Sequence, residues 1–143
     1  MKRFKLQTIL DYRELRRDLI RQELCDSIKR ETALIAEIRK EQEELDKLCR
    51  DLNNRRQVGI TPHELLMYEN RCSYKAELVG NIKKKLEVIQ NEITDQRRTL
   101  CEADRDEKLL ERLKEKQMLE DKRLLQKKET TETDEIAVRT YKR

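Results

Sequence analysis

The sequence predicts an all-α protein, a long antiparallel two-helix coiled-coil hairpin whose second helix is longer and is followed by a flexible C-terminal tail. Two long segments repeat apolar residues at steps of three and four, the pattern of a coiled-coil seam. A short Asn- and Gly-containing segment separates them. The composition agrees, because 45% of the residues are charged and 3% aromatic. That leaves too little apolar mass for a compact core of mixed elements.

We expect one coiled-coil unit over residues 1–143, with a helix at 5–52, a turn at 53–61, a helix at 62–127 and a tail at 128–143. The first helix carries a stripe that includes two polar members, Glu31 and Gln42. Its apolar members are Leu24, Ile28, Ile35, Ile38, Leu45, Cys49 and Leu52.

The second helix begins with favourable residues. Thr61 caps the free N–H groups, Pro62 suits the first helical position, and Glu64 completes a capping box. The stripe that follows lasts about six heptads, and Gly80 is its one weak helix former. Its members are Leu65, Tyr68, Cys72, Val79, Ile82, Leu86, Ile89, Ile93, Leu100, Ala103 and Leu110, with Lys75, Gln96 and Glu107 as polar residues in phase.

A short connection between two helices that each carry a seam implies antiparallel packing. In the predicted register, facing residues have numbers that sum to 117, so that Ile38 meets Val79 and Gln42 lies beside Lys75. Shared polar layers of this kind fix a register at some cost in stability.

Both helices change character at the end that carries the termini. Tyr12, Leu15 and Leu19 lie away from the seam of the first helix, and the apolar residues between 109 and 125 wrap around the second. A two-helix hairpin buries only one stripe per helix. The surplus apolar surface therefore binds another protein, self-associates, or forms a wider local core or a frayed end. The threonine-rich residues 129–133 weaken the helix, and a short helical pattern resumes at 134–139, so we expect a weakened or mobile joint followed by a terminal turn of helix.

Nothing in the sequence predicts catalysis, a cofactor, a metal site or a small-molecule substrate, and we expect a protein that is not an enzyme. The two glycines form no phosphate-binding loop, and His63, the single histidine, is expected to be a solvated first-turn residue. The four cysteines lack metal-ligand spacing and are expected to be free thiols, with Cys49 and Cys72 buried as small hydrophobes.

The charge pattern argues against a nucleic-acid partner. The net charge of +4 comes from 34 basic and 30 acidic residues interspersed along the chain, without interleaved aromatic residues. No signal peptide or membrane-spanning helix is predicted, so we expect a soluble, intracellular chain.

The ends of the chain carry a family resemblance. The opening Phe4-Lys5-Leu6-Gln7-Thr8-Ile9-Leu10-Asp11-Tyr12-Arg13-Glu14 resembles the start of FliJ-family proteins, the small coiled-coil subunits of the bacterial flagellar type III export apparatus. The closing Asp134-Glu135-Ile136-Ala137 and Arg139 are similar to the family's last segment, and the mid-chain turn followed by Tyr68 agrees in position.

This resemblance implies a stalk and adaptor, similar to the central stalk of rotary ATPases. It implies three partners: the hexameric flagellar export ATPase, the membrane export gate protein and the export chaperones. It also implies a cytoplasmic protein at the membrane face of the flagellar base, which we expect to be monomeric when free. The alternatives are a structural or scaffolding coiled coil and the equivalent stalk of a virulence-type secretion system.

The stalk analogy assigns two surfaces. The predicted gate surface consists of Leu45, Tyr68 and Tyr74. The predicted ring surface, which would bind the ATPase, lies at the end with both termini and consists of Phe4, Leu6, Ile9, Leu10, Tyr12, Arg13, Asp134, Glu135, Ile136 and Arg139.

Overall fold

The computed structural model describes residues 4–142, which form two helices and no strand. The first, α1, runs from Gln7 to Val58, and the second, α2, from Pro62 to Tyr141. With 52 residues in α1 and 80 in α2, the all-α class and the longer second helix are confirmed. Residues 1–3 and 143 of the predicted unit lie outside the described residues.

The chain divides into two compact units, each of which contains part of both helices. Unit 1 consists of Met1–Leu19 and Leu100–Arg143, and unit 2 of Ile20–Thr99. The expectation of one coiled-coil unit over the whole chain stays a prediction, and we describe the two units separately.

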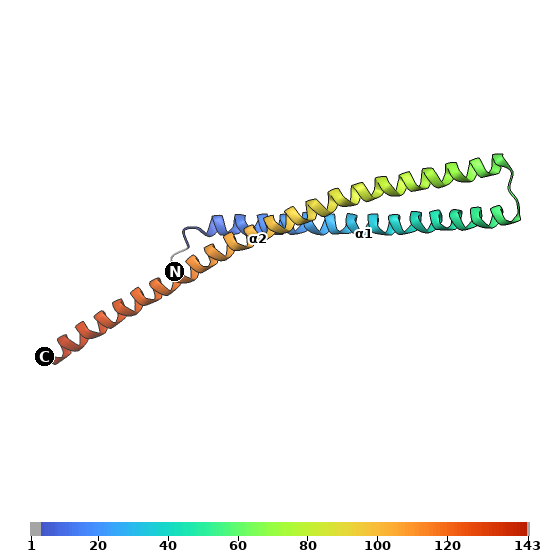
Figure 1. Cartoon of the computed structure of the whole chain (residues 1–143). Coiled ribbons are helices and arrows are strands. Elements are labelled where there is room, and N and C mark those ends of the chain that lie inside the picture. The colour runs from blue at the N-terminus through green and yellow to red at the C-terminus, as the bar shows by residue number, and fades with distance from the viewer. Residues whose placement is uncertain (1–3, 143) are drawn as a thin grey trace. The chain divides into compact units, whose positions relative to one another are not determined.

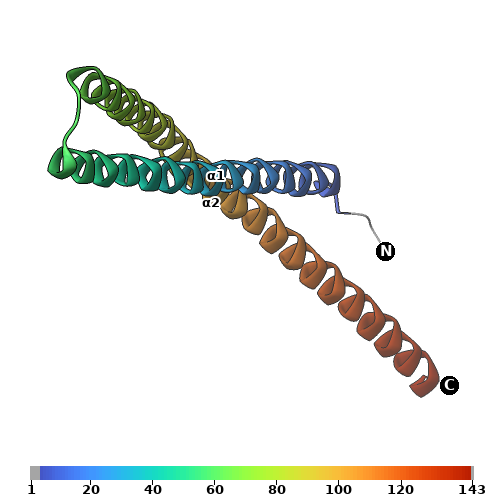
Figure 2. The same ribbon diagram turned by 90° about the vertical axis from the view of Figure 1, so that its right-hand side faces the viewer.

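Unit 2 is an antiparallel helical hairpin (Figures 1 and 2). Three residues, 59–61, join its helices. Gly59 has a φ of 118°, a conformation that favours glycine, and its N–H donates to the Arg55 carbonyl at 2.9 Å. The Glu64 N–H donates to the Thr61 hydroxyl at 3.3 Å, which confirms Thr61 as the N-cap of α2.

The predicted C-terminal ends of both helices are wrong, because α1 continues beyond residue 52 and α2 beyond residue 127. Residues 53–58, predicted as turn, form the last turns of α1. The positive charges of Arg55 and Arg56 stabilise this end, because they interact favourably with the negative end of the helix dipole. Arg55 also pairs with Glu64 at 3.6 Å. α1 begins at Gln7 rather than at residue 5, after a turn in which the Gln7 N–H donates to the Phe4 carbonyl at 3.0 Å.

The predicted end of the second helix at 127 is also wrong, since α2 continues through the threonine-rich segment to Tyr141. The hydroxyls of Thr130, Thr131 and Thr133 each donate to the backbone carbonyl four residues earlier, at 2.8–2.9 Å. Threonine side chains that bond in this way keep their polar group satisfied within the helix. The predicted joint at 129–133 is therefore helical, and the helical pattern of residues 134–139 is continuous with α2.

The predicted seam of α2 is confirmed. From Leu65 to Leu110 every predicted seam residue, including Lys75, Gln96 and Glu107, is buried or half-buried. Val79, Ile82 and Ile93 are 4%, 3% and 4% exposed. Regular steps of three and four therefore located the packed face of this helix from sequence alone.

The seam of α1 is rotated from the prediction, because every second position of the seam lies one residue earlier than expected. Leu24, Glu31, Ile38, Leu45 and Leu52 lie on it as expected. The alternate positions, however, are Ile20, Ser27, Leu34, Glu41 and Leu48, whereas Ile28 and Ile35 are 37% and 40% exposed and Cys49 is exposed.

The cross-helix pairs of unit 2 explain this rotation. Lys75 on the α2 seam pairs with Glu41 at 2.7 Å and with Glu44 at 2.6 Å. The predicted neighbour, Gln42, offers only an amide, whereas the rotated seam gives the ammonium group two carboxylates. In each ion pair of unit 2, the residue numbers of the two partners can be added and compared with the predicted sum. These sums lie between 116 and 125, with a mean near 120. The register is therefore displaced by about three residues from the predicted sum of 117.

Unit 1 pairs the first turns of α1 with the part of α2 that follows Leu100. Leu10 is 3% exposed and Ala103 6%, and these two are the buried apolar side chains among the described residues of unit 1. Beyond residue 121 every described residue of α2 is exposed, and no second helix lies beside these turns in either view (Figures 1 and 2).

Within residues 4–142, neither helix contains a stretch apolar and long enough to cross a membrane.

Candidate functional site

The N-terminal half of the predicted ring surface divides into covered and exposed side chains. Leu10 is part of the core of unit 1, and Phe4 and Leu6 are half-buried. Ile9 and Tyr12 are 45% and 62% exposed. The exposed pair is therefore free to contact a partner, while Leu10 holds α1 against α2.

Arg13, also predicted for the ring surface, is partly engaged within the chain. Its guanidinium donates to Asp106 at 3.1 Å, and the two side chains remain 33% and 49% exposed. An ion pair this open to water contributes little to stability. Arg13 can consequently exchange Asp106 for an acidic group on a partner at small cost.

The C-terminal half of the predicted ring surface lies on the unpaired turns of α2. Asp134, Glu135 and Arg139 are all exposed, and Ile136 is 63% exposed. In the register of the ion pairs, Leu10 of α1 faces Leu110. Asp134 is 24 residues further along the helix, or roughly 36 Å at 1.5 Å per residue. The structure does not bring the two halves into contact, so a partner that binds both must be large.

Exposed apolar side chains continue each half of this surface. On α1, Leu15 and Leu19 are 59% and 53% exposed and follow Tyr12 at steps of three and four, so the three form one stripe. On α2, the exposed apolar residues of unit 1 are Leu109, Leu113, Met118, Leu119, Leu124, Leu125, Ile136, Val138 and Tyr141. Leu15 and Leu19 are not part of the predicted ring surface, although their spacing from Tyr12 places them on the same face of α1.

A buried ion pair lies next to the N-terminal half. Arg17 pairs with Glu107, whose side chain is 5% exposed, and also contacts Asp18 at 3.3 Å. Burial by itself would lower the pKa of Arg17, but the charges and hydrogen bonds of Glu107 and Asp18 raise it. Periodicity identified Glu107 as a seam position without identifying Arg17 as its partner.

Carboxylates of Glu14, Glu107 and Glu111 lie within 4.8 Å of one another, the one such group among residues 4–142. Arg17 supplies a positive charge to Glu107 in this cluster. A permanent guanidinium competes with a metal ion for the same oxygens, so we assign no metal to it.

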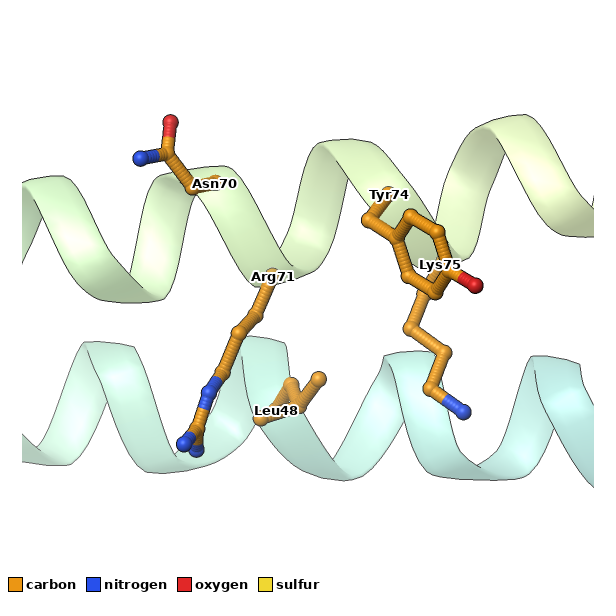
Figure 3. A pocket seen from close by; sticks show the side chains of 5 residues that line it. All are labelled: Leu48, Asn70, Arg71, Tyr74 and Lys75. Carbon is orange, nitrogen blue, oxygen red and sulfur yellow. The ribbon is translucent and has the colours of Figure 1, made fainter.

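The predicted gate surface is also divided. Leu45 and Tyr68 are half-buried at the helix interface of unit 2, whereas Tyr74 is 65% exposed. Tyr74 lies at a shallow groove of about 440 Å³ that Leu48, Asn70, Arg71 and Lys75 also line. In Figure 3 Arg71 and Lys75 reach from α2 toward α1, while Asn70 points away from it. Tyr74 is thus the member of this surface that a partner can reach.

The four cysteines are free thiols, as predicted. The expected burial of Cys49 is wrong, because the rotated seam places Leu48 at the interface instead. Cys72 is half-buried, and this burial, together with interaction with Cys49, raises the pKa of its thiol.

The comparisons with known proteins give a single result. The family described as flagellar FliJ protein matches residues 1–143, the entire chain. No curated protein and no solved structure matches it.

Proposed function

Because the chain belongs to the FliJ family of flagellar proteins, which takes part in flagellar protein export, we propose that it is the non-enzymatic stalk of the export ATPase. In this proposal it binds the centre of the hexameric ring through the predicted ring surface and promotes ring assembly and ATP hydrolysis. One chain serves one ring. It works in the cytoplasm at the membrane face of the flagellar base.

The observation that carries this proposal is the apolar surface that unit 1 leaves uncovered. Tyr12 and Leu15 are 62% and 59% exposed, although the seam beside them is packed, and Ile136, on the unpaired turns of α2, is 63% exposed. Exposed apolar side chains in such number are typical of a protein-binding surface. The separation of roughly 36 Å between the two halves favours a large partner such as a ring.

The same proposal includes two further contacts. Tyr74 and the groove around it form the surface for the membrane export gate, where Arg71 adds a positive charge to an aromatic ring. The export chaperones are the third partner, for which we assign no residues.

ATP hydrolysis by the cognate export ATPase, measured with and without this protein, tests the proposal. We expect substoichiometric stimulation, about one chain per hexamer. Deletion of residues 134–143 and the substitution Tyr12→Ala should each reduce it, because both remove exposed groups without touching the seam. Tyr74→Ala is the matched control, an equally exposed tyrosine of unit 2, and should leave stimulation unchanged.

Two results would contradict the proposal. One is an ATPase whose rate does not respond to the intact chain and which does not co-migrate with it. The other is full stimulation by the chain that lacks residues 134–143 and carries Tyr12→Ala. Circular dichroism of each variant verifies that the helices are retained.

A further inference from the structure

The last turns of α2 are a helix without a partner. All described residues after 121 are exposed, and the segment is about 20 residues long. A helix of this length is marginally stable on its own in water, since most helical stability in proteins comes from packing. The segment also carries apolar side chains that are more than half exposed, namely Leu124, Leu125, Ile136 and Val138.

The face that continues the seam carries an ordered set of charges. The steps of three and four that run through Leu110, Lys114, Gln117 and Asp121 continue to Leu124, Lys128, Thr131, Glu135, Val138 and Lys142. Charges thus alternate with other residues along this face, in the order acidic, basic, acidic and basic at Asp121, Lys128, Glu135 and Lys142.

We propose that this face binds the same face of a second copy of the chain in an antiparallel, two-fold pair. When Lys128 of one copy pairs with Glu135 of the other, at the diagonal offset at which Arg17 pairs with Glu107 in unit 1, Asp121 pairs with Lys142 in the same way. Because the arrangement is two-fold, each of these ion pairs occurs twice. A shift of one heptad in either direction brings Lys128 to Lys142 or to the other Lys128, so charge selects one register.

The chain itself already uses this kind of contact. In unit 1, Arg17 and Glu107 occupy seam positions on two antiparallel helices and pair across the interface. Both residues stand at the same type of heptad position, as Lys128 and Glu135 do. In unit 2, Lys75 on the seam pairs with Glu41 and Glu44. Oppositely charged seam residues are therefore a packing element of this coiled coil.

The inference goes beyond the proposed function and does not depend on it. It departs from the expectation of a monomer in the free state. Because the pairing covers Glu135, a tail engaged in it is not available to the ATPase ring.

Sedimentation equilibrium of the full chain at low salt tests the pairing. We expect a monomer–dimer equilibrium at concentrations up to about 200 μM, weakened by added salt. Lys128→Glu should raise the dissociation constant about tenfold or more, because it replaces two attractive contacts by two repulsive ones. Glu135→Lys should do the same. An equimolar mixture of these two variants should form a mixed dimer, since each repulsive contact becomes attractive.

Two controls make the result specific to this face. Arg123→Glu changes the net charge as Lys128→Glu does, but Arg123 lies five residues earlier, about 140° around the helix. It should leave the dissociation constant unchanged. The double variant Lys128→Glu with Glu135→Lys should restore dimerisation. A chain that remains monomeric at low salt overturns the inference, and so does a dimer that is indifferent to both single substitutions.

Discussion

Ile82 and Ile136 are the same residue type on the same helix, yet they are 3% and 63% exposed. Around Ile82, α2 presents an apolar seam that packs against α1. Near Ile136, the face that continues this seam carries Lys128, Glu135 and other residues, all of them exposed, and Ile136 itself lies one residue away from that face. A helical backbone therefore forms in both regions, but only the first has an apolar stripe that specifies an intramolecular partner. The second leaves its apolar side chains exposed.

The largest effect that this comparison predicts is at Ile82. Ile82→Ala should lower the free energy of unfolding by about 2–3 kcal/mol, because it removes buried methyl groups and leaves a cavity. Ile136→Ala should change it by less than about 0.5 kcal/mol. Ile35→Ala, at a position that the rotated seam of α1 leaves exposed, should cost less than about 1 kcal/mol. Urea denaturation followed by circular dichroism measures all three.

Equal losses at Ile82 and Ile35 would mean that the predicted α1 seam, not the rotated one, packs in solution.

The next effect is at the ion pair of unit 1. Arg17→Ala leaves the carboxylate of Glu107 buried without its partner. Breaking a buried ion pair in a globular core costs about 3–5 kcal/mol. Two helices shield a charge from water less than such a core does, so we expect the free energy of unfolding to fall by about 2 kcal/mol. The double variant Arg17→Met with Glu107→Leu should recover most of this loss. A loss at Arg17 that the double variant does not recover would point to packing of the arginine stem instead. The measurement is again denaturant unfolding.

A smaller effect, of opposite sign, is expected at Gly80. No atom lies within 4 Å of the position that a Cβ would take there, and the residue is helical. Gly80→Ala should therefore raise the free energy of unfolding by about 0.5–1 kcal/mol. Gly59→Ala is the contrasting variant, because a φ of 118° strains any residue with a Cβ. It should destabilise the hairpin, and a thermal melt distinguishes the two signs.

The smallest effect is the pH dependence of the Lys75 layer. Hydrogen bonding to Lys75, and its charge, lower the pKa of Glu44, while bonding to Glu41 and Glu44 raises the pKa of Lys75. The contribution of Glu44 to the free energy of unfolding is therefore complete above the ordinary pKa of a glutamate, and it is lost as pH falls through the lowered pKa that Glu44 has in the folded chain. The contribution of Lys75 is complete below the ordinary pKa of a lysine, and it is lost as pH rises through the raised pKa that Lys75 has in the folded chain.

Unfolding of the wild type and of Glu44→Gln, compared between pH 7 and about pH 3, measures the acid limb. The difference between the two chains should shrink toward the acid end. A difference that stays constant over this range would exclude the ion pair as its source.

Part of the exposure at the predicted ring surface follows from the sequence. Exposure of Tyr12 is predicted because two helices cannot cover more than one stripe each, whereas Ile136 belongs to the predicted ring surface through the family resemblance alone. Leu10 was assigned to the binding surface, although it lies two heptads before Leu24, a spacing that identifies it as a seam residue. Arg13 is assigned to the predicted ring surface by the family resemblance, and its pairing with Asp106 depends on a residue 93 positions away, which no local pattern reveals.

The sequence by itself determined two helices, their antiparallel order, the cap at Thr61 and the seam of α2, because each follows from local chemistry or from a long, unambiguous period. Tertiary packing alone decided the face of α1. Its two candidate stripes share every second member and differ by one residue at the others, so the centre of the stripe turns by about 50°, half of the 100° that separates neighbouring residues. The choice between them depends on what α2 presents, and Lys75 favours the rotation that supplies Glu41 and Glu44.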